Sequence, residues 1–157
     1  MLAKLLDLKR LLLVSPELLC VLAVALLAHR NPEFFEAVAS SVRDAKGLPA
    51  FLGGLPLVLV GVSYKLGMDV LRPGDEEENK VLYQWPQYWA LEFRVTVSLL
   101  LCGVATGAMA LFYLNPLEWS PATSGAVFVG AMLVPVMTVI PLAAAKLAIR
   151  KILTLYR

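Results

Sequence analysis

The stretch VTVSLLLCGVATGAMALFYLNPL, residues 95–117, runs for 23 residues without a charged side chain. A second uncharged run of 27 residues, WSPATSGAVFVGAMLVPVMTVIPLAAA, follows at 119–145. A bilayer core about 30 Å thick is crossed by roughly 20 helical residues, each rising about 1.5 Å. Each run is therefore long enough to cross a membrane. The break between them, Asn115 to Ser120, predicts a tight turn between antiparallel helices.

Two further apolar stretches, at about residues 11–29 and 48–71, extend this pattern to four transmembrane helices. Ser15-Pro16-Glu17 in the first is typical of a helix start, with an N-cap hydroxyl, a proline and an acid. Alternatively, Pro16 only kinks one continuous helix. Residues 32–46 between these stretches predict a short amphipathic helix, which either lies in the membrane interface or covers the ends of its neighbours.

The composition agrees with a membrane protein. Hydrophobic residues make up 59% of the 157-residue chain, whereas soluble domains have about 45–50%. We therefore expect an all-α integral membrane protein with one polytopic membrane domain, residues 1–157. Its spans are predicted at 11–29, 48–71, 92–114 and 121–149, with the interfacial helix at 32–46. The net charge of +2 and the scattered basic residues exclude direct nucleic-acid binding.

Basic residues near the ends of the spans predict the orientation, because cytoplasmic loops are enriched in lysine and arginine. Eleven of them fall on one side and three, Arg30, Arg43 and Lys46, on the other. The eleven are Lys4, Lys9, Arg10, Lys65, Arg72, Lys80, Arg94, Lys146, Arg150, Lys151 and Arg157. We therefore expect a bacterial inner-membrane protein with both termini in the cytoplasm.

Glu17 is the sharpest functional candidate, because an ionisable group inside a span is costly and is often kept for ion, proton or ligand handling. It could instead be an acid that stabilises a helix start at the membrane surface. A four-span chain with a carboxylate in its first helix resembles the small multidrug-resistance exporters in outline. In that family, the resemblance implies, the carboxylate exchanges protons for cationic drugs. The longer loops, amphipathic helix and aromatic segment of this chain depart from the family, so its mechanism is not carried over.

Two features of the last two spans concern helix packing. Gly103 and Gly107 form a GxxxG pattern, which lets another helix backbone approach closely, either from the same chain or from a second subunit. Pro135 and Pro141 free backbone carbonyls and predict a kink in the fourth span.

The loops on the side predicted to be cytoplasmic carry the remaining candidates. Asp75 to Lys80 is predicted to be a polar turn. The aromatic residues that follow it, Tyr83, Trp85, Tyr88 and Trp89, are typical of a membrane surface. The basic residues Lys146, Arg150, Lys151 and Arg157 are candidate contacts for a cytosolic protein or for lipid headgroups.

Catalytic signatures are missing from the sequence. Cys20 and Cys102 lie in apolar runs and are interpreted as small buried hydrophobes, and His29 has no second ligand at metal-binding spacing. No nucleophile triad, metal motif or phosphate loop is present. We therefore expect no enzyme activity, no metal and no cofactor.

These features predict a small membrane subunit that forms homo-oligomers, contacts membrane lipids, and anchors, senses or signals to a cytosolic partner. A prokaryotic stress-response or phage-defence system would suit such a subunit. The alternative is a small proton-coupled exporter or an oligomeric pore.

Overall fold

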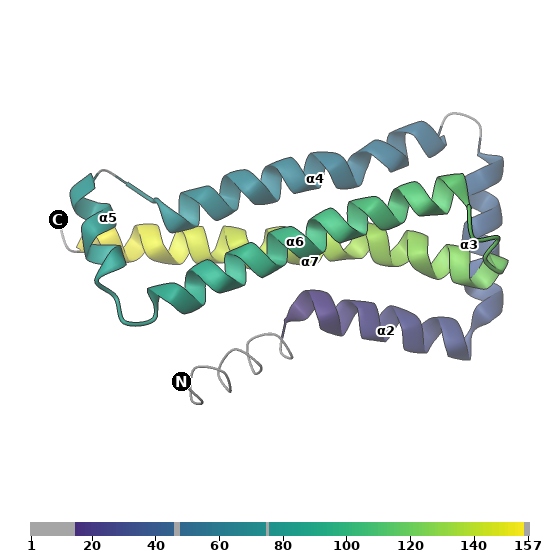
Figure 1. Ribbon diagram of the computed structural model, residues 1–157, viewed down its shortest axis with the longest axis horizontal. Helices are drawn as coiled ribbons and strands as arrows, with labels where there is room; N and C mark the ends of the chain where they lie inside the picture. The colour runs from purple at the N-terminus through teal and green to yellow at the C-terminus, as the bar shows by residue number, and fades with distance from the viewer. Residues whose placement is uncertain (1–14, 46–47, 75, 156–157) are drawn as a thin grey trace.

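The computed structural model describes residues 15–45, 48–74 and 76–155, and all regular secondary structure in these ranges is helical (Figure 1). This confirms the predicted all-helical class. The helices are α2 (Pro16–Arg30), α3 (Pro32–Asp44), α4 (Leu48–Leu71), α5 (Glu76–Tyr83), α6 (Tyr88–Leu114) and α7 (Pro121–Leu155).

Three helices are long and apolar enough to cross a membrane, which indicates membrane localisation. They cover Phe51–Leu71, Tyr88–Leu114 and Pro121–Ile152. Helices α2 and α3 meet the same criterion only as a pair, and they are bent by 104° at the break between them. The described chain therefore contains three candidate spans, or four if the bent pair is counted as one broken span.

The observed helix ends refine the predicted ones. Helix α4 has the predicted bounds, whereas α6 begins four residues before the predicted 92 and α7 continues six residues beyond the predicted 149. Ser15 has an extended backbone and its side chain accepts a hydrogen bond from the Leu18 amide, so a helix starts at Pro16 rather than continuing through it. The part of the predicted first span before Ser15 lies outside the described residues.

The polar turn expected at Asp75 to Lys80 is a wrong prediction, because residues 76–83 form helix α5. The Asn79 side chain, in the first half of α5, donates a hydrogen bond of 2.9 Å to the carbonyl oxygen of Gly74. This bond holds the helix against the residue that precedes it by two positions. The predicted return turn between α6 and α7 is confirmed: Asn115 ends α6 in the left-handed conformation, with φ of 43°.

Helix α7 is the centre of the bundle and packs against α2, α3, α4 and α6. Apolar contacts gather in two clusters. One lies where α3 crosses the bundle and contains Ala39, Val42, Met109, Phe112, Phe128 and Ala131. The other lies toward the opposite end and contains Val70, Val95 and Leu142.

Helix α3 covers the ends of its neighbours, the second of the two predicted alternatives (Figure 1). Its apolar face, Phe35, Ala39 and Val42, is buried. Gly125 of α7 makes this contact possible: a Cβ atom there would overlap the Phe35 carbonyl oxygen and lie 2.7 Å from its carbon. The two backbones are therefore in direct contact.

Candidate functional site

Glu17 lies in the first turn of α2 but is not at a surface, since only 1% of it is exposed. The predicted helix start explains the backbone here. Ser15 caps the helix and Pro16 occupies its first position. A helix-start acid gains its stabilisation without burial, however, so this role does not account for the environment of the side chain.

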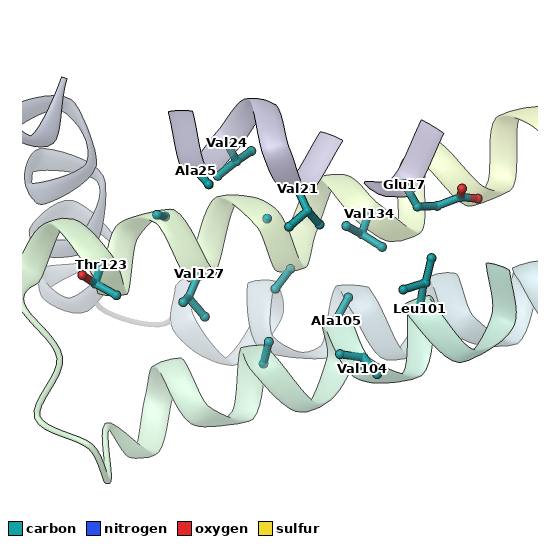
Figure 2. A pocket seen from close by; sticks show the side chains of 14 residues that line it. Glu17, Val21, Val24, Ala25, Leu101, Val104, Ala105, Thr123, Val127 and Val134 are labelled. Carbon is teal, nitrogen blue, oxygen red and sulfur yellow. The ribbon is translucent and has the colours of Figure 1, made fainter. Parts of the chain in front are cut away.

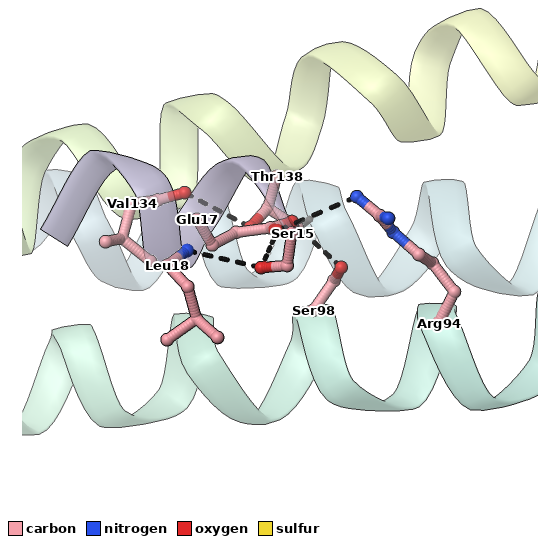
Figure 3. Close-up of polar contacts among 7 residues, drawn as sticks. All are labelled: Ser15, Glu17, Leu18, Arg94, Ser98, Val134 and Thr138. Carbon is pink, nitrogen blue, oxygen red and sulfur yellow. Dashed lines mark hydrogen bonds and ion pairs between the residues drawn. The ribbon is translucent and has the colours of Figure 1, made fainter. Parts of the chain in front are cut away.

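Three hydroxyl groups from three helix segments donate hydrogen bonds to the Glu17 carboxylate (Figure 3). Ser15 reaches Oε2 at 2.8 Å. Ser98 of α6 and Thr138 of α7 reach Oε1 at 2.9 and 3.3 Å. Because a buried charge is costly unless it is hydrogen-bonded, this ring of hydroxyls makes the position tolerable and joins α2, α6 and α7.

Arg94 of α6 supplies the nearby positive charge. Its Nη2 atom is 3.9 Å from Glu17 Oε2, and 30% of the arginine side chain is exposed. This distance is that of an ion pair without a direct hydrogen bond. Arg94 and Ser98 are four residues apart, so one face of α6 presents both groups to the carboxylate.

The Thr138 hydroxyl has a single proton but two possible acceptors. Its oxygen is 3.3 Å from Glu17 Oε1 and 3.1 Å from the Val134 carbonyl oxygen. When Glu17 is ionised, Thr138 can donate to it. When Glu17 carries a proton, Glu17 can donate to Thr138, which then donates to Val134. The same oxygen atoms can therefore hold the carboxyl group in either protonation state.

The site lies within the apolar part of the bundle, close to the end that carries Arg94. Ser98 is the fourth residue of the uncharged run 95–117. Thr138 precedes Lys146, the next charged residue of α7, by eight positions or about 12 Å along the helix. Helix α2 thus begins between its neighbours rather than at an end of the bundle, as Figure 1 shows.

An apolar crevice of about 320 Å³ runs from Glu17 along the outside of α7. We call it the α2–α6 crevice: it is bounded by α2 from Glu17 to Ala25, by α6 from Leu101 to Ala108 and by α7 from Thr123 to Val134. Figure 2 shows Glu17 at one end, with its carboxylate turned away from the other lining side chains. Helices α2 and α6 make few direct contacts, so α7 forms the floor between them.

The predicted packing glycines do not pack within the subunit. Gly103 and Gly107 are exposed, and a Cβ atom on either would meet nothing within 4 Å. Pro135 and Pro141 lie within α7, which is assigned as one continuous helix. The kink stays a prediction.

The candidates at the other end of the bundle have mixed outcomes. Lys146 donates a hydrogen bond of 2.6 Å to Asp69 of α4, so part of its charge serves to join two helices. Arg150 and Lys151 are exposed on α7, and Arg157 lies outside the described residues. The aromatic residues flank the start of α6: Tyr83 and Tyr88 stack edge to face at 5.0 Å, Trp85 is exposed and Trp89 is half-buried.

Sequence reasoning found Glu17 but missed its partners. Ser98 and Thr138 were visible as scarce polar residues inside spans, and this was the available signal. Arg94 was counted only as a basic residue near a membrane surface. In the described part of the chain, no three His, Cys, Asp or Glu side chains lie close enough to hold a metal ion.

Comparison with known proteins gives no relative: no family model, curated protein or solved structure matches this chain.

Proposed function

We propose that this chain is a non-enzymatic membrane protein that couples proton movement to transport at Glu17. The observation that carries the proposal is the burial of this carboxylate, 1% exposed, among hydroxyl groups of α2, α6 and α7. Ionisable side chains inside membrane helices are rare, and they commonly mark proton or substrate pathways. Of the two roles that the sequence offers for Glu17, burial between helices favours the functional one.

Proton uptake at Glu17 has a direct structural consequence in this proposal. The ionised carboxylate attracts Arg94 across 3.9 Å, and this attraction ends when the carboxylate gains a proton. Thr138 then reverses its role from donor to acceptor. The attraction between Glu17 and Arg94 of α6 therefore depends on the proton, and this is the contact through which proton uptake would change how α2 and α6 are held together.

Transport by Glu17→Gln in proteoliposomes tests the proposal. Glutamine has nearly the same shape but cannot exchange a proton. With an imposed pH gradient and ethidium as a cationic dye, we expect the unaltered protein to accumulate the dye and Glu17→Gln to fail. Glu36→Gln, which alters an exposed carboxylate on α3, is the matched control and should transport normally.

Two results would count against the exporter. Uptake by Glu17→Gln that equals uptake by the unaltered protein would show that the carboxylate is not required, and no uptake by either protein would remove this substrate class. Leakage of calcein from otherwise tight vesicles would favour the oligomeric pore instead.

A second proposal is that the protein forms homo-oligomers through α6 and anchors, senses or signals to a cytosolic partner. The open face at Gly103 and Gly107 favours it, because such a face allows close helix approach and is unused within the subunit. In the proposed setting, a bacterial inner membrane, the C-terminal end of α7 faces the cytoplasm with Arg150 and Lys151.

Replacement of the two glycines tests this assembly. Gly103→Leu with Gly107→Leu should convert the oligomer to monomers in native mass spectrometry of protein extracted from its source membrane, because the larger side chains hold the backbones apart. Gly61→Leu, at an equally open position on α4, should leave the oligomer intact. A soluble protein that co-purifies with the unaltered oligomer would identify the partner; its absence from every preparation would contradict the anchoring role.

A further inference from the structure

We propose that the α2–α6 crevice binds one acyl chain of a membrane lipid. Two of the three helices that bound the crevice, α6 and α7, are long and apolar enough to cross a membrane, so its open side faces lipid in that setting. Its surface comes from small and branched apolar side chains, among them Val21, Val104, Ala108 and Val127. This inference concerns a ligand site and stands independently of the transport proposal.

The polar groups at the two ends are already engaged. Glu17 Oε1 and Oε2 are bonded to Ser98, Thr138 and Ser15, so the crevice receives the carbon stem of Glu17 rather than its charge (Figure 2). At the other end, the Thr123 hydroxyl is within 2.8 Å of the Ser120 hydroxyl. A polar ligand would give up its hydrogen bonds with water and find no side-chain partner without a hydrogen bond at these ends. An apolar ligand has no hydrogen bonds to give up on entry.

The length of the crevice matches one leaflet of a bilayer. Thr123 lies two residues into α7, beside the turn that ends the span, and Val134 is eleven residues further along. This separation corresponds to about 16 Å of helix, and Glu17 to Ala25 corresponds to about 12 Å on α2. Half of a hydrocarbon core is about 15 Å thick. A chain that enters beside Thr123 therefore ends near Glu17.

The inner end of the crevice is too narrow for a protein helix. The Glu17–Ser98 hydrogen bond of 2.9 Å draws α2 and α6 together there. A helix with its side chains is about 10 Å across, so it cannot follow the crevice to this end, but a flexible hydrocarbon chain can. By filling the space, the chain supplies the dispersion contacts that α2 and α6 do not make with each other.

Photolabelling of retained lipid tests the proposal. The full-length protein is reconstituted with phosphatidylethanolamine that carries a diazirine midway along one chain, extracted in mild detergent, freed of unbound lipid and irradiated. We expect the label on Val127 and Val134, which line the crevice floor, and not on Val58 and Val62, which are 65% and 41% exposed on the surface of α4.

A crevice-filling variant makes the test specific. Gly130 lines the crevice, and a Cβ atom there would meet nothing within 4 Å, so Gly130→Leu can place its side chain in the free space. We expect retained label to fall about tenfold, which corresponds to roughly two displaced methylene contacts. Gly61→Leu on α4 should retain the label. Ala126→Leu is a second filling variant if Gly130→Leu lacks the helical circular dichroism of the unaltered protein.

The contrary results are distinct. Label confined to the α4 valines, or equal label in Gly130→Leu and the unaltered protein, would overturn the proposal. Retained lipid that labels other residues and leaves Val127 and Val134 unlabelled would also overturn it.

Discussion

At the scale of single residues, the main feature is the set of hydrogen bonds that the buried Glu17 carboxylate accepts. Glu17 is among the largest fully buried side chains, and every hydroxyl bonded to it comes from Ser15, Ser98 or Thr138. Removing one partner of a buried polar group leaves the other without compensation. The hydroxyls should therefore matter to folding as well as to the proposed transport.

Thr138→Val should destabilise the protein by about 1 kcal/mol, because valine keeps the shape of threonine but cannot bond to Glu17. Thr96→Val is the matched control: Thr96 is exposed on α6 and its hydroxyl bonds only to the Glu92 carbonyl of its own helix. Thermal unfolding in detergent measures both. Equal midpoints for the two variants would show that the Thr138 contact contributes nothing.

The sequence could identify Glu17 because a carboxylate within an apolar run is conspicuous. It could not identify Arg94 as the neighbour. The i, i+4 spacing places Arg94 and Ser98 on one face of α6, but which helix meets that face depends on α2 starting halfway along the bundle. That start is a matter of tertiary packing and has no local signal.

At the scale of secondary-structure elements, α3 is the helix for which the sequence allows two roles. Its apolar face predicted burial or interfacial binding equally well, and the structure uses it to cover α7. Arg43 strengthens this contact: its Nη2 atom donates to Ser124 at 3.3 Å, and its guanidinium lies 5.3 Å from the centre of the Phe112 ring.

Gly125→Ala should weaken the contact between α3 and α7 by about 1–3 kcal/mol, because the new methyl group overlaps the Phe35 carbonyl. Gly130→Ala on the same helix meets open space and should be neutral or stabilising, since alanine favours helix. Unfolding midpoints of the two variants give the comparison. A Gly125→Ala protein as stable as Gly130→Ala would mean that α3 does not sit on α7 in this way.

The glycines also show what spacing alone cannot predict. Gly103 and Gly107 have the expected pattern but face outward, whereas Gly125 belongs to no such pattern and lies directly against the Phe35 backbone. A GxxxG pattern predicts a helix face that allows close approach, but it does not predict which helix packs there.

The ion pair between Asp69 of α4 and Lys146 of α7 should tolerate an exchange of its two charges. Asp69→Lys alone places two cations together and should lower stability slightly, because the pair is partly exposed and screened. Adding Lys146→Asp should restore most of the loss. Unfolding in low and high salt distinguishes the variants; a double variant no better than the single one would contradict a direct pairing.

At the scale of the whole molecule, α5, the start of α6 and the end of α7 share one end of the bundle, and α3 lies at the other (Figure 1). The lengths of the main spans followed from the sequence, because a long uncharged apolar run predicts a membrane-spanning helix of about the same length. The short α2 and its 104° bend to α3 did not follow, because they depend on how α2 and α3 pack on α7, which no local pattern in the sequence specifies.

The orientation proposed from the basic residues predicts which end of the bundle is accessible from each side of the membrane. A cysteine introduced by Glu36→Cys on α3 should react with an impermeant maleimide added to intact cells, and one introduced by Gln84→Cys after α5 should react only after the membrane is opened. The native cysteines are changed to alanine in both proteins. Labelling in the reverse order would overturn the orientation derived from the basic residues.

Infrared difference spectroscopy of the reconstituted protein, recorded between acidic and alkaline buffer, tests most directly whether the buried Glu17 exchanges a proton. Arg94 is the charged group placed against it, while Ser98 and Thr138 supply neutral contacts. Beside the bands of the exposed acids, we predict one further protonated-carboxyl band that appears on acidification in the unaltered protein and in Glu36→Gln but is missing from Glu17→Gln. Spectra in which Glu17→Gln lacks no band of the unaltered protein would contradict the central claim that Glu17 gains and loses a proton within the helical bundle.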